Sequence, residues 1–228
     1  MVIDYNQLLQ QCTGSVHPQI MHGIIRQESS FNPYAIGVVN GSLSRQPTTK
    51  DEAVRAVKTL QAKGMNYSMG LAQVNKQHMR RFGFTAESIF EPCANVKAGA
   101  AIFNQCHTAA KAKFGNTPHA IGAALSCYYS GNFTTGFKRY GRDKAPYVDS
   151  VRNQMRTYNN RPAQIGTPQL QRAAMTIRIQ TTQPQPVRVA AVQESEHIAA
   201  EVRETPFVLT GSSSSADLPQ KPNSNLIF

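Results

Sequence analysis

The chain has 228 residues and is strongly basic, with 24 Lys and Arg residues against 13 Asp and Glu residues. Its formal net charge of +11 at pH 7 favours an anionic partner, such as nucleic acid, anionic lipid or an acidic cell-wall polymer. The sequence contains no apolar run of about 18 residues or more, so we expect no membrane span.

Charge and composition divide the chain near residue 159. Residues 1–158 carry 18 basic residues against 8 acidic ones, whereas residues 159–228 carry 6 against 5. The second part is rich in Gln, Thr, Pro and Ser, and such a segment buries too little apolar surface to offset its ordering entropy. We therefore expect a folded domain over 1–158 and a largely disordered tail over 159–228, whose apolar stretch at 198–208 could become ordered on a partner.

The basic residues of the folded part are scattered and form no motif that recognises bases, so we expect no nucleic-acid partner. The first residues lack the basic stretch and the apolar run of a secretory signal. From the residues alone, a removed signal, another export route and a cytoplasmic location all stay open.

The N-terminal part predicts two helices, the second of which ends at a glutamate. Residues 3–12 have the spacing of a short amphipathic helix, and Pro18 suits the first turn of the next one. That helix should end at about Glu28, because Asn32-Pro33 cannot continue it. Its apolar positions should face a core: Ile20, Met21, Ile24 and Ile25.

The position of Glu28 suits a catalytic acid. A carboxylate in the last turn lies at the negative end of the helix dipole, and apolar neighbours also disfavour its charge. Both effects favour the protonated form that a general acid must hold near neutral pH. The alternative is a solvated glutamate at an ordinary helix end.

Turn and capping signals predict the following elements. Asn40-Gly41 lies between short apolar runs and predicts a small β-ribbon over residues 34–43. Thr49 and Glu52 form a capping box, which opens a helix. Further helices are expected from Asn75 to about Phe82, from Pro92 to about Lys113, over 118–129, and from Ala145 onward. Gly and Ala residues along the long helix from Pro92 imply close helix–helix packing.

Four cysteines, at positions 12, 93, 106 and 127, are compatible with two disulfides or with four reduced thiols. A zinc site is the alternative, but its candidate ligands include no C-x-x-C pair and match no usual finger spacing. Those ligands would be Cys106, His107, His119 and Cys127. The remaining histidines form no ligand cluster, and we therefore expect neither a metal nor a cofactor.

Four motifs follow one another within residues 1–157: ESSFNP at 28–33, GLAQ at 70–73, NVKAGA at 95–100 and ALSCYYSG at 124–131. In this order they resemble the ESxFxP, GLMQ, N-x-x-x-G-x and AxxAYNAG motifs of the soluble lytic transglycosylases, which are relatives of goose-type lysozyme. Ala72, Cys127 and Tyr129 stand where the family motifs have Met, Ala and Asn. Four motifs in order are far more specific than any one of them.

Within this family, the chain looks most like the transglycosylase subunits of type IV secretion systems. That likeness rests on YAIG at 34–37, LSRQP at 43–47, the four cysteines and the Pro/Gln-rich tail. The resemblance implies a mainly α (α+β), lysozyme-like catalytic domain with a small β-hairpin, and a periplasmic location. It also implies peptidoglycan glycan strands as substrate and makes the tail a candidate for contacts with secretion-system subunits.

The resemblance further implies a one-acid mechanism. Glu28 would protonate the glycosidic oxygen between N-acetylmuramyl and N-acetylglucosamine units, then act as base on the muramyl C6 hydroxyl, which closes onto C1 as a 1,6-anhydro end. Most glycosidases use two carboxylates, yet no second acid lies in the four motifs. The other candidates look like helix caps or exposed charges: Asp51, Glu52, Glu87 and Glu91.

Position in the motifs assigns roles around Glu28. Tyr128 should hydrogen-bond or orient this acid, Gln73 should bind the sugar near the cleavage point, and Ser29 is a candidate polar contact. Their ordinary alternatives are a core aromatic, a satisfied buried amide and a turn residue. The groove wall is expected to come from Met69, Gly70 and Leu71.

Two other functions compete with a transglycosylase. A lysozyme-like muramidase would keep the fold but use water, and a peptidoglycan-binding scaffold would recruit secretion subunits through its tail with incidental catalysis. The products of digestion and the effect of replacing Glu28 discriminate these possibilities.

The cysteine pairing can also be argued from the expected helices. Cys93 and Cys106 would lie about 20 Å apart along one helix, whereas a disulfide allows only ~4.4–6.8 Å between Cα atoms. The active-site end should hold the start of the long helix and the end of the 118–129 helix. We therefore expect Cys93 to pair with Cys127, and Cys12 with Cys106.

Overall fold

The computed structural model describes residues 3–139 and 144–158 of the chain. Within these residues the elements are α1 (Tyr5–Cys12), α2 (Pro18–Ser29), β1 (Ile36–Val38), α3 (Lys50–Ala62), β2 (Tyr67–Met69), β3 (Val74–Asn75), α4 (Met79–Phe82), α5 (Pro92–Phe114), α6 (Pro118–Ser130) and α7 (Tyr147–Arg156). Short 3-10 helices are Lys76–His78, Ser88–Phe90 and Thr135–Phe137. The predicted mainly α fold is confirmed here, whereas the tail predicted at 159–228 lies outside the described residues.

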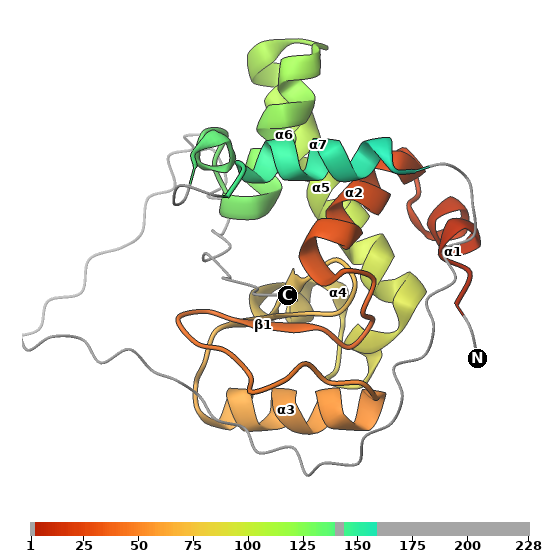
Figure 1. Ribbon diagram of the computed structural model, residues 1–228, viewed down its shortest axis with the longest axis vertical. Helices are drawn as coiled ribbons and strands as arrows, with labels where there is room; N and C mark the ends of the chain where they lie inside the picture. Colours follow the sequence, from red (N-terminus) through yellow and green to blue (C-terminus); the bar gives the residue numbers. More distant parts are fainter. Residues whose placement is uncertain (1–2, 140–143, 159–228) are drawn as a thin grey trace, which may run out of the picture.

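The helices surround one apolar core, and the small sheet lies between α2 and α3 (Figure 1). α3 forms one end of the molecule, and α7 lies across α2 towards the other end. The long α5 runs from the region of the sheet to the far end of α6. This arrangement brings the end of α2, and with it Glu28, near the middle of the molecule.

The sheet corrects one detail of the sequence analysis. Its three strands are antiparallel in the order β1-β2-β3, and Ile36 lies opposite Met69. The ribbon predicted locally over 34–43 is wrong, because β1 pairs with β2 rather than with the residues after Asn40. Asn40 does turn the chain with φ 54°. All three residues of β1 are buried, however, so their backbone N–H and C=O groups need hydrogen-bond partners inside the protein. The equally buried strand β2 provides them.

Local capping signals explain where the helices begin and end. Thr49 and Thr117 accept hydrogen bonds at the N-termini of α3 and α6, and Asn75 does so for the 3-10 helix before α4. Gly83 and Gly131 end α4 and α6 in the left-handed conformation. The starts of α3 and of the 3-10 helix therefore follow Thr49 and Asn75, as the sequence predicted.

Close packing of α5 depends on its small residues. A Cβ atom added at Gly99 would overlap the side chain of Ala72 and come within 3.3 Å of Met21 Cε. The sequence-based expectation of tight packing along this helix is therefore confirmed at Gly99, where α5 approaches the 70–73 turn and α2.

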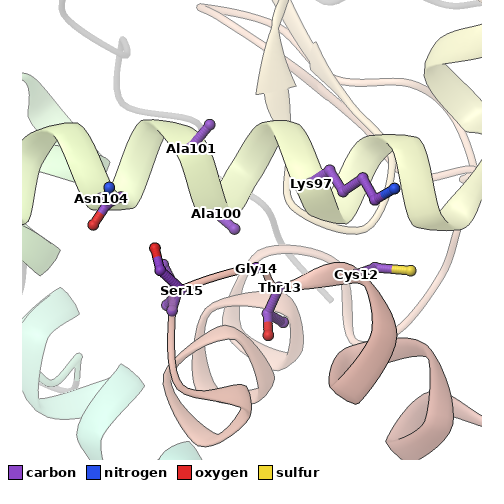
Figure 2. A pocket seen from close by; sticks show the side chains of 9 residues that line it. Cys12, Thr13, Gly14, Ser15, Lys97, Ala100, Ala101 and Asn104 are labelled. Atoms are coloured by element: carbon purple, nitrogen blue, oxygen red, sulfur yellow. The ribbon is translucent and has the colours of Figure 1, made fainter.

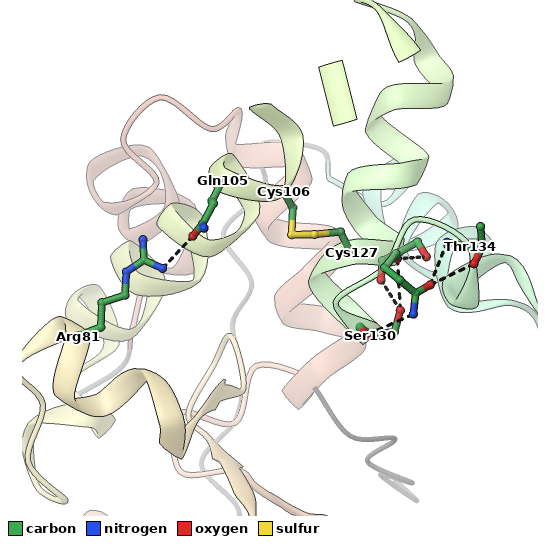
Figure 3. Close-up of a disulfide and its surroundings, with 8 residues drawn as sticks. Arg81, Gln105, Cys106, Cys127, Ser130 and Thr134 are labelled. Carbon is green, nitrogen blue, oxygen red and sulfur yellow. Dashed lines mark hydrogen bonds between the residues drawn. A yellow bond between two sulfur atoms is a disulfide. The ribbon is translucent and has the colours of Figure 1, made fainter. Parts of the chain in front are cut away.

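Both disulfides differ from the expected pairing. Cys12 bonds Cys93 with a Cα–Cα distance of 5.3 Å, and Cys106 bonds Cys127 at 5.7 Å (Figure 3). α5 and α6 form an antiparallel hairpin, so residues equally far from the connection between the helices lie side by side. Cys106 and Cys127 satisfy this condition. The shorter α6 ends before it reaches Cys93, which meets the end of α1 instead.

Two of the surface hollows among the described residues lie away from Glu28, and neither is lined by a residue predicted for catalysis or substrate binding. One lies between the segment after α1 and one face of α5, beside Cys12 (Figure 2). The other is lined by the start of α3 and Glu87. No helix of the described segments is both long and apolar enough to cross a membrane.

Candidate active site

Glu28 lies in the last turn of α2, directly before a strained turn. The chain leaves the helix through Ser30 (φ 48°) and Phe31 (φ 65°), both in the left-handed region. This conformation is unusual for a bulky residue such as Phe31 and persists only where the surroundings impose it. The hydroxyl of Ser29 donates to the carbonyl of Ile25 at 3.0 Å, so Ser29 bonds within its own helix.

Buried aromatic contacts hold this turn in place. The hydroxyl of Tyr5 donates to the carbonyl oxygen of Phe31 at 2.8 Å, and the two rings lie 4.9 Å apart between centroids. Burial raises the pKa of Tyr5 to about 12, so its hydroxyl remains a donor. The ring of His22 packs against Phe31 at 5.2 Å. These contacts fix the direction in which the chain leaves Glu28.

The Glu28 carboxyl group has a defined hydrogen-bond donor. Glu28 is only 5% exposed, and its Oε1 accepts a hydrogen bond of 2.7 Å from the hydroxyl of Tyr147, the first residue of α7. Burial, followed by the charge of Glu28, raises the pKa of Tyr147 well above its ordinary value. The phenol therefore stays protonated and remains a donor to the carboxyl group at physiological pH.

Tyr128 links the surroundings of Glu28 to the 70–73 turn. It is 1% exposed on α6, and its hydroxyl donates to the carbonyl oxygen of Ala72. Burial and then the charge of Glu28 raise the pKa of the Tyr128 phenol, so the two groups interact electrostatically. The role predicted for Tyr128 in orienting Glu28 stays a prediction.

Asn95 holds the turn that carries the second motif. Its Nδ2 donates to the carbonyls of Met69 (3.0 Å) and Ile89 (2.9 Å), and its Oδ1 accepts from the backbone of Ala72 (2.8 Å). Gly70, with φ +74°, lies directly against this amide, and a Cβ there would overlap it. Glycine is therefore required at Gly70 by both its backbone conformation and its contact.

Gln73 shapes the same turn from within. It is completely buried with φ 46°, and its Nε2 donates to the carbonyls of Ala35 and Gly70, each at 2.9 Å. Its Oε1 is buried without a hydrogen-bond partner among the described residues. Met69 and Leu71 are also completely buried. The side chains of this turn are thus packed inside the protein, and one amide oxygen among them has no hydrogen-bond partner among the described residues.

Within the described residues, Glu28 is the one acidic side chain that is buried. Other carboxylates are engaged elsewhere. Glu52 pairs with Arg45 at 2.7 Å, Glu87 with Lys58 at 3.2 Å, and Glu91 with Lys50.

No group of three or more side chains suited to bind a metal occurs in the part of the chain that the structure describes. The zinc alternative is contradicted more directly, because Cys106 and Cys127 are joined in a disulfide.

The structure brings together residues from all four motifs, since Asn95 and Gly99 of the third motif contact the 70–73 turn, and it adds one residue that the sequence analysis missed. Tyr128 connects the other two parts of the site. Its hydroxyl donates to the carbonyl oxygen of Ala72 in the 70–73 turn, and the charge of Glu28 contributes to the raised pKa of its phenol. Tyr147 was expected only as part of an amphipathic helix. Its one sequence signal is an aromatic residue at the first helical position, and its pairing with Glu28 depends on how α7 packs on α2.

Residues 8–147 match the model of the transglycosylase SLT domain family, and the chain belongs to this family. The type IV secretion system protein virB1 of Brucella suis biovar 1 is 48% identical over 138 residues, which cover 60% of this chain and 58% of that protein. Protein virB1 of Agrobacterium fabrum is 24% identical over 138 residues, or 59% of this chain and 54% of its own length. No solved structure matches the chain.

Proposed function

We propose that the chain is a peptidoglycan lytic transglycosylase that cleaves the bond between N-acetylmuramyl and N-acetylglucosamine units. The observation that carries this proposal is a single buried acid, Glu28, which receives a hydrogen bond from Tyr147 in a chain of the SLT family. We assign the catalytic domain to residues 1–158. The basic charge of this region suits an anionic wall polymer.

The proposed reaction proceeds in two proton transfers. Glu28 first gives its proton to the glycosidic oxygen as the bond from that oxygen to C1 of the muramyl unit breaks. The resulting carboxylate then takes the proton of the C6 hydroxyl of the same unit, whose oxygen forms the new bond to C1. The products are a free N-acetylglucosamine hydroxyl and a 1,6-anhydro end, and Glu28 is protonated again.

The intramolecular hydroxyl explains why one acid suffices. A second carboxylate in a glycosidase either activates water or attacks the sugar itself. Here the substrate supplies the attacking oxygen, already held close to C1, so neither role is needed. The pairing of Glu52, Glu91 and Glu87 with basic side chains agrees with this assignment.

The residues around Glu28 have proposed supporting roles. The buried turn at 70–73, with Met69, shapes the wall behind the sugar site. Because Gln73 is completely buried, a sugar donor reaches its unpaired Oε1 only when this turn opens. Ser29 and Tyr128 are buried and contribute through the shape and polarity of the wall behind the acid.

We further propose that the enzyme opens the wall locally for a type IV secretion apparatus in the periplasm. The relatives named as type IV secretion system proteins support this context. The two disulfides support it as well, because disulfides persist in oxidising compartments such as the bacterial periplasm. Contacts of residues 159–228 with secretion subunits remain a prediction.

Digestion of purified peptidoglycan with the full chain tests the proposed chemistry. Mass spectrometry should find muramyl ends that are lighter by one water than the ends left by hydrolysis, because the C6 hydroxyl closes the ring. Reducing muramyl ends of full mass would identify a lysozyme-like hydrolase instead.

Tyr147→Phe removes the donor to Glu28 while keeping the ring. Hydrogen bonds to charged groups are the stronger ones, so we expect kcat to fall by about 10- to 100-fold with little change in KM. Rates of soluble fragment release at several peptidoglycan concentrations measure both. Tyr158→Phe, two residues beyond the C-terminal end of α7, is the matched control and should behave as wild type. A wild-type kcat for Tyr147→Phe would contradict the proposed role.

A further inference from the structure

Tyr129 has no role in the reaction described so far, yet it contacts the residue that bonds Glu28. Its ring stacks on the ring of Tyr147 with centroids 4.5 Å apart and planes inclined by 16°. This is the shortest ring–ring separation among the described residues. Tyr129 lies in the last turn of α6, next to Tyr128, and is partly exposed.

The near end of α7 is held by packing and not by a cap, since Val148 next to Tyr147 is completely buried in the core. Tyr147 is the first residue of the helix, and the preceding Pro146 makes no side-chain cap hydrogen bond. The first turn of a helix has backbone N–H groups without intrahelical partners, so an uncapped start is the end most prone to fray. The position of Tyr147 must therefore come from sideways contacts.

The far end of α7 is anchored differently. Gln19 donates to the carbonyl of Met155 at 3.1 Å, and Arg26 donates to the side-chain oxygen of Gln154 at 3.0 Å. Gly23 lets α2 approach α7 so closely that a Cβ atom added at Gly23 would lie 2.5 Å from Met155 Cγ. These contacts hold the C-terminal end of α7 on α2. The end at Tyr147 is held instead by the buried Val148 and by the contacts of the Tyr147 side chain.

We propose that Tyr129 is a positioning residue, which holds the ring of Tyr147 by face-to-face stacking so that its hydroxyl stays on Oε1 of Glu28. The expected effect on catalysis rests on the proposed function. The positioning of the Tyr147 ring by Tyr129 does not depend on that function. A stacked ring restricts rotation of Tyr147 about its side-chain bonds. Tyr129 thereby acts on the acid through Tyr147 and need not touch the substrate.

The asparagine that the related motif carries at this position cannot stack in this way. Tyr129→Asn and Tyr129→Ala should therefore both release the ring of Tyr147, and we expect kcat to fall roughly 3- to 10-fold with KM unchanged. Tyr129→Phe keeps the stacked ring and should restore kcat to nearly the wild-type value. A residue that contacts the sugar directly would instead change KM.

A double-mutant cycle separates positioning from independent action. In the Tyr147→Phe background the hydroxyl is already absent, so Tyr129→Ala should lower kcat little further. Equal losses from Tyr129→Ala in both backgrounds would overturn the proposal. Phe133→Ala removes a partly buried ring that follows α6 and contacts Phe114, the last residue of α5, and it should lower stability without lowering kcat.

Crystal structures of the full chain and its Tyr129→Ala and Tyr129→Phe variants give a readout that needs no activity. We expect the Tyr147 hydroxyl to lie beyond hydrogen-bond distance of Glu28, or in more than one position, in Tyr129→Ala only. An unchanged hydrogen bond in Tyr129→Ala would overturn the proposal. If wild-type protein cleaves no peptidoglycan, the proposed function fails, and these structures still decide whether Tyr129 positions Tyr147.

Discussion

Replacing Glu28 with glutamine should lower kcat for peptidoglycan cleavage by at least about 10³-fold, because general acid–base catalysis contributes on the order of 10²–10⁴-fold and Glu28 serves in both proton transfers. Glutamine has nearly the same shape, and its side-chain oxygen can still accept the hydrogen bond from Tyr147. The variant should therefore fold normally and bind glycan strands. Release of soluble fragments, followed over time, measures the loss.

Glu91→Gln is the matched control for Glu28→Gln. Glu91 is a surface carboxylate paired with Lys50, with a side chain 56% exposed, so its replacement should leave kcat unchanged. Lytic activity retained by Glu28→Gln would contradict the assignment of Glu28. A separate outcome concerns the scaffold alternative. If Glu28→Gln leaves secretion or DNA transfer intact while deletion of the protein abolishes it, the scaffold role is the one that matters in the cell.

Asn95→Ala should lower the free energy of unfolding by about 3 kcal/mol or more, because each buried backbone group left unpaired costs roughly 1–3 kcal/mol. Three such groups lose their partner: the carbonyls of Met69 and Ile89 and the N–H of Ala72. For a domain of this size the loss corresponds to a Tm about 6–12 °C lower. Thermal unfolding followed by circular dichroism measures it.

Asn104→Ala is the control for Asn95→Ala, because Asn104 is an exposed asparagine on the same helix. It should leave Tm close to the wild-type value. Asn95→Asp keeps the acceptor for Ala72 but loses both donors, so it should be destabilised as well. A Tm for Asn95→Ala equal to that of Asn104→Ala would show that the 69–73 segment is not held as described.

The sequence predicted the features that depend on neighbours in the chain. Thr49, Asn75 and Thr117 start helices because their side chains accept hydrogen bonds from backbone N–H groups a few residues ahead. Asn32-Pro33 excludes a longer α2, so the place of Glu28 at a helix end followed from local rules. The four motifs then indicated this end as the candidate site.

Features that depend on tertiary packing were not predicted. Tyr147 bonds Glu28 across 119 positions, and nothing in the local sequence of α7 indicates which residue of α2 it meets. The partner of β1 also lies far along the chain. The disulfide of Cys106 with Cys127 is different, since the short connection between α5 and α6 already implies it. That pairing was predicted wrongly because the ends of helices of unequal length were assumed to coincide.

Digestion of peptidoglycan in water enriched in the heavy oxygen isotope tests the central claim most directly. If Glu28 transfers protons for an attack by the muramyl C6 hydroxyl, the oxygen of the new bond to C1 comes from the substrate. The newly formed muramyl ends should then be anhydro ends that carry no heavy oxygen. Heavy oxygen at C1 of these ends would show that water attacks, and it would contradict the one-acid transglycosylase mechanism.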